Sequence, residues 1–234
     1  MTRWLRCGLL SALILSASLW GSGSAQEPAS AASVDTLGHA RPQTVVFSGG
    51  CFWGVQAVFE HVQGVLRATA GYAGGTARTA EYEIVSTGTT GHAESVRVVY
   101  DPRQVSFGRL LEVFFSVVHD PTQLDHQGPD RGPQYRSAIW YTTPEQAAAA
   151  RTYIRHLTDA KTFSRPIVTA VNPLEGFYAA EAYHQDYYFM HPHQPYIVMN
   201  DTPKVRQLRR AFPALWREDP VRWMPRAAVS AGHP

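Results

Sequence analysis

A cysteine in the stretch "FSGGCFWG", residues 47–54, is the side chain of this sequence best suited to chemistry. Cys51 follows β-branched and aromatic residues that predict a strand, and it precedes a segment with the apolar spacing of a helix. A helix N-terminus carries roughly half a positive charge, which favours a thiolate over a thiol. Three interpretations are open: a buried packing thiol, a metal ligand or a nucleophile.

A cysteine hydrolase would need a histidine base beside Cys51, oriented by Asn or Asp. His92, His119 and His184 are candidates, and a secreted hydrolase that uses His119 or His184 is the alternative function. No local pattern selects one of these histidines, so the alternative stays open.

A metal site would need several ligands at short spacing. The stretch "MHPHQ" offers Met190, His191 and His193, which could serve a secreted copper- or zinc-binding module. Without a second cysteine or a carboxylate cluster beside them, these residues are more typical of a polar loop. The sequence therefore predicts no bound metal.

Two polar, loop-rich stretches carry acids and phenols that could assist a cysteine. "YEIVSTGTTGHAE" contains Tyr82 and Glu94, and "HDPTQLDHQGPDRGPQYRS" contains Asp130 and Tyr135. For any one of these residues, an ordinary solvated loop is the commoner explanation. A glutamate beside an apolar pocket would nevertheless have a raised pKa, so that it could hold a proton at neutral pH and donate it.

Phe52 and Trp53 follow the cysteine directly and are either core residues or one wall of a pocket. Phenols can hydrogen-bond a polar oxygen without adding charge. A thiolate, a protonated carboxyl, two phenols and an aromatic wall would together fit a small S=O group with a methyl group beside it.

The first 25 residues have the pattern of a secretory signal peptide. Arg3 and Arg6 form a basic start, Cys7–Trp20 is an apolar run, and "GSGSA" offers a cleavage site after Ala25. An uncleaved anchor is the alternative, although a spanning helix needs about 20 apolar residues. The sequence predicts an exported protein, periplasmic or extracytoplasmic, with a linker over residues 26–41.

Cleavage would change the charge and the cysteine count. Lys+Arg falls from 21 to 19 because Arg3 and Arg6 leave, and Asp+Glu stays at 19. A formal charge near zero gives no field to attract nucleic acid. Cys51 would be left without an internal disulfide partner.

Hydrophobic patterns predict alternating strands and helices from residue 43 onward. In order, the pattern is β-α-β-β-α-β, then a helix and a further strand, which is typical of a ferredoxin-like α/β sandwich with additional helices and a C-terminal extension. The strands are expected over 43–49, 64–75, 94–102, 136–141 and 166–171, and the helices over 52–62, 106–121 and 143–157. The catalytic domain is expected over residues 42–210, followed by a tail over 211–234.

Six motifs in order make the sequence resemble the peptide methionine sulfoxide reductase A family. They extend over most of residues 45–200 and are "GCFWG" (50–54), "GYAGG" (71–75), "YEIVSTGTTGHAE" (82–94), "HDPT" (119–122), "QGPDRGPQYRS" (127–137) and "AEAYHQDY" (180–187). The resemblance implies a peptide-methionine (S)-S-oxide reductase, a thiol-dependent oxidoreductase that acts on free methionine sulfoxide or on oxidised methionine in proteins. It agrees with the ferredoxin-like prediction.

The resemblance also implies a role for each site residue. Cys51 matches the nucleophile, and Glu94 matches the acid that protonates the sulfoxide oxygen. Thiolate attack on the sulfur releases methionine and leaves Cys51 as a sulfenic acid. The implied substrate-binding residues are Phe52 and Trp53 around the methyl group, Tyr82 and Tyr135 at the oxygen, and Asp130 in the same site.

The sequence departs from many family members in lacking resolving cysteines, since residues 191–234 contain none. The resemblance therefore implies no bound cofactor and an external thiol as reductant: thioredoxin, glutaredoxin or a small thiol. Asp125 and His126 replace the usual Asn-Arg at the rim of the site, and His184 is expected to buttress the site. The protein is expected to be a monomer.

Overall fold

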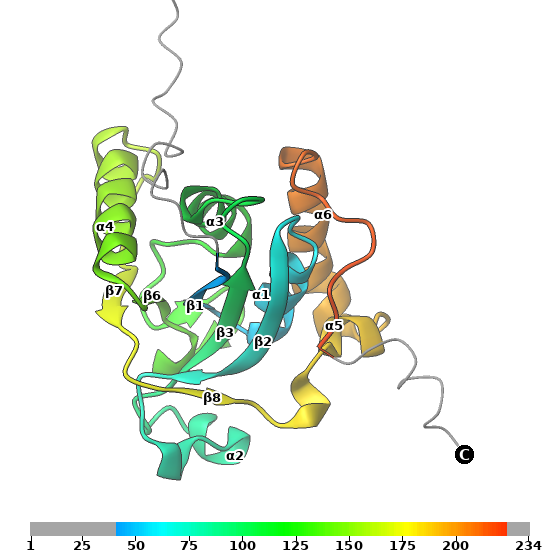
Figure 1. Cartoon of the computed structure of the whole chain (residues 1–234). Coiled ribbons are helices and arrows are strands. Elements are labelled where there is room, and N and C mark those ends of the chain that lie inside the picture. The colour runs from blue at the N-terminus through cyan, green and yellow to red at the C-terminus, as the bar shows by residue number, and fades with distance from the viewer. Residues whose placement is uncertain (1–40, 224–234) are drawn as a thin grey trace, which may run out of the picture. The chain divides into compact units, whose positions relative to one another are not determined.

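Six strands form one mixed sheet in the computed structural model, which describes residues 41–223 (Figure 1). Neighbouring strands are antiparallel, except that β6 and β7 are parallel. Across the sheet, the strands are β7 (Ala170–Pro173), β6 (Ser137–Tyr141), β1 (Gln43–Gly49), β3 (Ala93–Tyr100), β2 (Val65–Ala73) and β8 (Phe177–Ala179). A separate two-stranded ribbon consists of β4 (His126–Gln127) and β5 (Asp130–Arg131).

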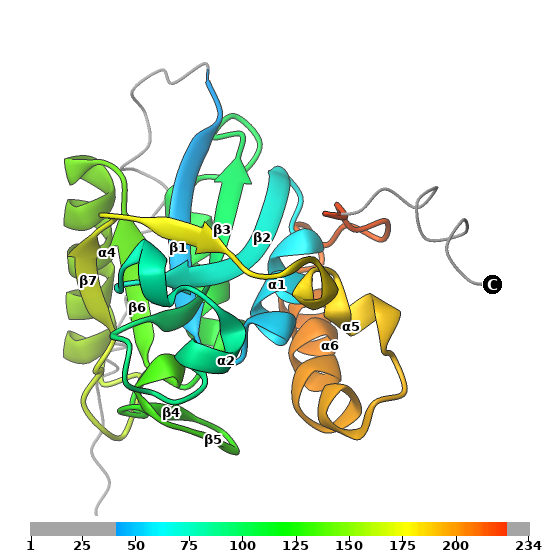
Figure 2. The same ribbon diagram turned by 90° about the horizontal axis from the view of Figure 1, so that it is seen from below.

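The helices differ in length and in their relation to the sheet. The α-helices are α1 (Phe52–Glu60), α2 (Tyr82–Val85), α3 (Phe107–Val113), α4 (Pro144–Asp159), α5 (Tyr187–Met190) and α6 (Thr202–Ala211). Two π-helical turns, η3 (Phe114–Val118) and η6 (Ile197–Asp201), adjoin α3 and α6, and short 3-10 turns are η2 (Ala77–Thr79), η4 (Pro133–Tyr135) and η5 (Ala182–His184). Figure 2 shows α5 and α6 beside α1, in agreement with the packing of both helices on α1.

The central four strands confirm the predicted ferredoxin-like sandwich. The chain runs β1-α1-β2-β3-α3-β6, while the sheet order is β6-β1-β3-β2, which is the split βαβ arrangement. Alternate residues of β1 point to opposite faces: Val45 and Phe47 join the large core that includes α1 and α3, and Val46 joins a smaller cluster with Trp140. The β7 and β8 strands extend this sheet at its two edges.

The helix starts predicted from the sequence have the expected hydrogen bonds. Ser106 caps α3 by accepting a bond from the Arg109 N–H at 3.2 Å, and Thr143 caps α4 by accepting one from the Gln146 N–H at 3.3 Å. Such caps satisfy N–H groups that have no partner within the helix. Local chemistry therefore sets where these two helices begin.

Four elements differ from the sequence-based expectation. The last predicted strand begins at Ala170 instead of residue 166, because Pro166 has no N–H and the Val168 N–H bonds to the Pro121 carbonyl at 2.8 Å. The predicted helix over 106–121 changes from α to π geometry at Phe114. Strand β8 and helix α6 were not predicted, since β8 is three residues long and α6 buries only Val205 and Leu208.

Aromatic stacking joins strand β1 to helix α1 and to the π-helical turn η3. The Phe47 ring stacks on Phe59 of α1 at 5.0 Å and on Phe114 at 4.7 Å between centroids. Such pairs contribute about 0.5–1.5 kcal/mol beyond the burial of their area. The end of β1 and the start of α1 are thereby held rigidly on one core.

Two parts of the predicted organisation concern the chain ends. The predicted signal peptide and almost all of the linker lie outside the described residues. Within 41–223, no helix has the length and apolar content needed to cross a membrane. The first part of the predicted tail packs on the domain, where the Gln63 N–H bonds to the Leu215 carbonyl and the Arg217 N–H to the His61 carbonyl, both at 2.7 Å.

Candidate active site

Cys51 lies in the turn between β1 and α1, at the N-cap of the helix. Gly50 makes this turn with φ of 89°, a conformation that side chains other than glycine rarely adopt. A Cβ at Gly50 would also lie 2.6 Å from Cβ and Cγ of Gln127. Cys51 has a free thiol and is buried, with 7% of the residue exposed.

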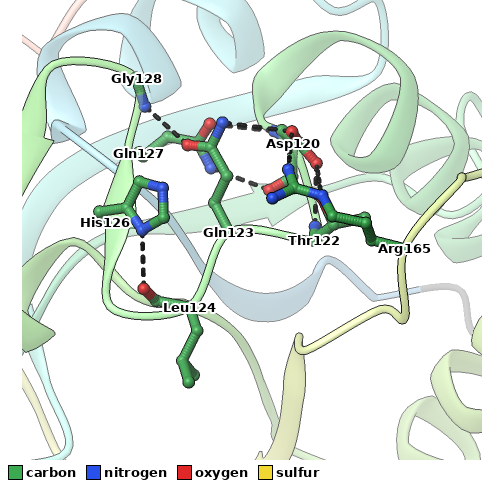
Figure 3. Close-up of polar contacts among 8 residues, drawn as sticks. All are labelled: Asp120, Thr122, Gln123, Leu124, His126, Gln127, Gly128 and Arg165. Carbon is green, nitrogen blue, oxygen red and sulfur yellow. Dashed lines mark hydrogen bonds and ion pairs between the residues drawn. The ribbon is translucent and has the colours of Figure 1, made fainter.

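Gln127 lies against this turn. It also ties together the loop over residues 120–128 (Figure 3). Its side-chain Oε1 accepts a hydrogen bond from the Asp120 N–H, and its Nε2 donates to the Asp120 carbonyl, both at 3.1 Å. The Asp120 carboxylate in turn accepts from Thr122 and pairs with Arg165 at 3.4 Å. The predicted rim residue His126 has its Nδ1 2.7 Å from the Leu124 carbonyl within the same loop. The other predicted rim residue, Asp125, adopts a positive φ of 51°.

Glu94 reaches the cysteine turn from β3. The Phe52 backbone N–H donates to Glu94 Oε2 at 2.9 Å, so the carboxyl is bonded to the residue next to Cys51. Glu94 is 4% exposed. One carboxyl oxygen is thus fixed by the protein next to Cys51.

Burial keeps both reactive groups protonated. The pKa of the Cys51 thiol is well above its ordinary value, chiefly because of burial and then because of the negative charges of Glu94 and Asp201. Burial, together with Asp130 and Asp201, raises the pKa of Glu94 to about 8, although the Phe52 N–H opposes this shift. The prediction of a raised pKa for the glutamate is confirmed.

The expected thiolate is wrong for the resting site. Cys51 has the predicted place at the start of a helix, and the Trp53 backbone N–H and Lys204 do favour the thiolate. Desolvation and nearby carboxylates outweigh these two effects. The resting site therefore holds a thiol and a neutral carboxylic acid at neutral pH.

The two aromatic residues after Cys51 have different surroundings. Phe52 is 1% exposed and packs against Tyr72 and His184, with ring centroids 5.9 and 5.1 Å away. Trp53 is half-buried, stacks on Tyr187 at 3.8 Å, and donates its indole N–H to His184 Nδ1 at 3.1 Å. Phe52 is therefore part of the core, whereas Trp53 lies nearer the surface.

The two predicted phenols and Asp130 belong to the same electrostatic cluster. Burial and then the charge of Glu94 raise the pKa of both Tyr82 and Tyr135, and Cys51 contributes to both. Asp130 also has a raised pKa, chiefly from burial, and its Oδ2 accepts a hydrogen bond from the Tyr196 hydroxyl. Tyr82 and Tyr135 thus interact with both Glu94 and Cys51, and Asp130 interacts with Glu94 and Tyr135.

Three residues of this cluster were missed from the sequence: Tyr196, Asp201 and Lys204. Tyr196 precedes η6, Asp201 ends η6, and Lys204 lies in α6. Asp201 is in fact fully buried, and the charge of Cys51 is the second cause, after burial, of a raised pKa at Tyr196. A sequence pattern has no means of signalling a buried charge of this kind.

The histidines required by a hydrolase are engaged elsewhere. His92 Nε2 lies 3.0 Å from the Thr76 carbonyl, and His119 Nδ1 lies 3.0 Å from the Phe114 carbonyl. His184 bonds to Trp53, and burial lowers its pKa, so that it is neutral and supports the tryptophan as expected. No group of three metal-binding side chains occurs within the described part of the chain.

The fold and the site together define an α/β protein in which a cysteine and a carboxylic acid share one buried site. A family model for peptide methionine sulfoxide reductases matches residues 43–215. The chain therefore belongs to the peptide methionine sulfoxide reductase family, and the predicted resemblance is confirmed.

Individual relatives and solved structures support this membership. The chain is 54% identical to peptide methionine sulfoxide reductase MsrA 2 of Mesorhizobium japonicum over 76% of this chain and 92% of the relative, and 52% identical to MsrA 2 of Synechocystis over 73% and 79%. Methionine sulfoxide reductase A of Corynebacterium diphtheriae is a structural match with a TM-score of 0.59 at 36% identity, covering 68% of this chain and 80% of that one. Reduced Mxr1 of Saccharomyces cerevisiae matches with a TM-score of 0.61 at 28% identity, over 67% and 90%.

Replacing Gly50 by alanine is expected to disturb the cysteine turn by two effects. The positive φ and the contact with Gln127 should together lower the free energy of unfolding by about 2–4 kcal/mol, given about 1–3 kcal/mol for such strain alone. Gly128→Ala is the matched control, because Gly128 has φ of 58° but a Cβ added there would meet no atom within 4 Å. Urea unfolding measures both variants, and equal losses would show that Gln127 does not constrain the turn.

Proposed function

We propose that the chain reduces methionine S-sulfoxide, free or within proteins, with Cys51 as nucleophile and Glu94 as proton donor. The reaction class follows from family membership, which makes the chain a peptide-methionine (S)-S-oxide reductase. The assignment of the two roles is supported above all by the hydrogen bond that ties Glu94 Oε2 to the Phe52 N–H. It keeps the acid beside the sulfur that attacks.

The proton on Glu94 solves the main difficulty of the reaction. A sulfoxide oxygen is a poor leaving group, and protonation makes the sulfur more electrophilic and avoids a bare oxygen anion. As Glu94 gives up its proton to the oxygen, its carboxylate can accept the proton of the Cys51 thiol. The site can therefore begin with a thiol and still present a thiolate at the moment of attack.

The oxygen is transferred to the cysteine in the overall reaction. Cys51 loses two electrons and becomes a sulfenic acid, while the methionine sulfur gains two and leaves as a thioether. We assign Tyr82 and Tyr135 to the sulfoxide oxygen and Asp130, supported by Tyr196, to the polar part of the substrate. We assign Trp53 and the buried Phe52 to the methyl group. The clustering of these groups around Cys51 supports the assignments.

The chain has two cysteines, Cys51 and Cys7, and Cys7 belongs to the predicted signal peptide. After cleavage no second cysteine would remain to reduce the sulfenic acid, so external thiols complete the proposed cycle. One thiol condenses with the sulfenic acid to form a mixed disulfide and water. A second thiol releases Cys51 and leaves as an external disulfide. Thioredoxin, glutaredoxin and small thiols all have the required chemistry.

We also propose export, with residues 1–25 as the signal peptide and oxidised exported proteins as substrates. Basic, apolar and small residues in that order support this proposal. N-terminal sequencing of the protein from a periplasmic extract should begin at Gln26. An intact Met1 on a protein confined to the cytoplasm would contradict it.

Glu94→Gln should lower kcat/KM by about 10²–10⁴-fold, the usual contribution of a positioned acid. In the wild type, kcat/KM should fall as pH rises through about 8, because the acid form of Glu94 is lost there. This limb should disappear in the glutamine variant. Glu83→Gln, at an exposed carboxyl, is the control and should retain the wild-type profile.

A hydrolase would give the opposite pattern, with activity that depends on a histidine and survives Glu94→Gln. An S-sulfoxide assay over pH 5–10, run beside an ester or peptide hydrolysis assay, separates the two functions. A wild-type rate near pH 8 that is unchanged by Glu94→Gln would contradict the assigned role of Glu94.

One equivalent of methionine S-sulfoxide, without any reductant, should convert Cys51 to a sulfenic acid that dimedone traps. Mass spectrometry of the Cys51 peptide should show the dimedone adduct at near-full occupancy in the wild type. Cys51→Ser is the negative control. A disulfide between Cys51 and Cys7 in place of the adduct would contradict the need for an external thiol.

A further inference from the structure

Asp201 lies directly against the first turn of α1, which carries the cysteine. The residue ends η6 and is 0% exposed. A Cβ at Gly54 would lie 2.1 Å from Asp201 Oδ1, so the carboxylate occupies the space that any other residue at this position would fill. Helix α6, which begins at the next residue, packs against α1 (Figure 2). The contact is therefore built by a glycine three residues after Cys51.

The carboxylate of Asp201 is incompletely satisfied. Lys204 Nζ approaches Oδ1 at 3.4 Å, and the Lys204 side chain is 19% exposed. Oδ2 has no hydrogen-bond partner within residues 41–223. A buried charge with so few partners is costly for stability, and such groups in native proteins call for an explanation beyond packing.

The pair faces the two groups that exchange protons in the reaction. Charge on Asp201 acts on both Cys51 and Glu94, and charge on Lys204 acts on Cys51 in the opposite direction. Three other titratable groups share this field. Asp130 acts on Asp201 and is itself acted on by Lys204, Asp201 acts on Tyr196, and Lys204 acts on His119. Tyr82 and Tyr135 complete the ring of groups around Cys51.

We propose that Asp201 and Lys204 are positioning residues that determine how the protons are divided between Cys51 and Glu94. The proposal deepens the proposed function, on which it rests. Asp201 discourages a negative charge on either group and so keeps the acid on Glu94 ready for donation. Lys204 lowers the cost of a thiolate on Cys51 and so favours transfer of the thiol proton at the moment of attack.

The pKa of Asp201 sets the pH range over which the pair acts. Burial raises it to about 6, while Lys204 opposes the shift and Asp130 adds to it. Asp201 is therefore ionised above pH 6 and neutral well below it. Its influence is present throughout the range in which Glu94 and Cys51 titrate.

The test is the rate at which iodoacetamide alkylates Cys51 as a function of pH, in the full-length chain. Mass spectrometry of the peptides separates Cys51 from Cys7, and the measurement requires no sulfoxide. Below the thiol pKa, the rate is proportional to the thiolate fraction, so a shift of one unit changes it about tenfold. Four variants are compared: Asp201→Asn, Lys204→Met, Lys204→Arg and, as a control that removes an exposed positive charge from the same helix, Arg206→Met.

Asp201→Asn should raise the alkylation rate at pH 7.5 by about tenfold, and Lys204→Met should lower it by about tenfold. Lys204→Arg and Arg206→Met should stay within about twofold of the wild type. In sulfoxide reduction, Asp201→Asn should also move the alkaline limb of kcat/KM to lower pH, because the pKa of Glu94 falls. Opposite effects from two neighbouring residues distinguish charge from a general loss of structure.

The proposal is overturned if Asp201→Asn and Lys204→Met change the rate in the same direction, or if both stay within twofold of the wild type. It is also overturned if Lys204→Arg behaves like Lys204→Met, because the charge would then be irrelevant. Failure of the proposed function has a separate signature, since a wild-type protein that alkylates as described but reduces no sulfoxide would contradict only the reductase assignment.

Discussion

The hydrogen bond from the Phe52 N–H to Glu94 Oε2 is the constraint on which the site depends. It joins residues that are 42 positions apart in the chain, and it exists because β1 and β3 are neighbours in the sheet. The strand pairing carries Glu94 to the end of β1, where the chain turns into α1. A carboxyl and a thiol are thereby brought together without any direct bond between them.

Burial determines what this arrangement can do. Water would ionise the carboxyl and leave it unable to donate a proton at neutral pH. In the closed environment between α1 and the sheet, Glu94 remains an acid up to about pH 8, and Cys51 remains a thiol. The site thus holds a proton on each group at rest. The proposed reaction therefore requires substrate binding and proton transfer, rather than the helix N-terminus alone, to generate the thiolate.

Much of the fold could be predicted from the sequence because local patterns and tertiary structure agree. Strong periodicity marked β1, β3 and α3, and capping residues such as Thr143 marked the helix starts. The edge strand β8 was not predicted, because it is only three residues long and is defined by its pairing with β2 rather than by a pattern of its own. Helix α6 was missed because its apolar face is narrow.

The site, like the fold, could be predicted only in part from the sequence. Cys51 and Glu94 could be proposed from their motifs, and in the structure Glu94 is hydrogen-bonded to the residue after Cys51. The ionisation state of Cys51 could not, because it depends on the total burial and charge around the sulfur. Asp201 illustrates the reason, as its charge reaches the cysteine from a segment 150 residues later in the sequence.

The central claim is that Glu94 is a neutral acid beside Cys51 in the resting protein. Infrared difference spectroscopy of the wild type against Glu94→Gln, recorded across pH 5–10, observes this proton directly through the carboxylic C=O stretch. The account predicts a carboxylic acid band that is present at pH 7, vanishes with an apparent pKa near 8, and is missing in the variant. A band assigned to Glu94 that titrates near pH 4.5, leaving a carboxylate at pH 7, would contradict it.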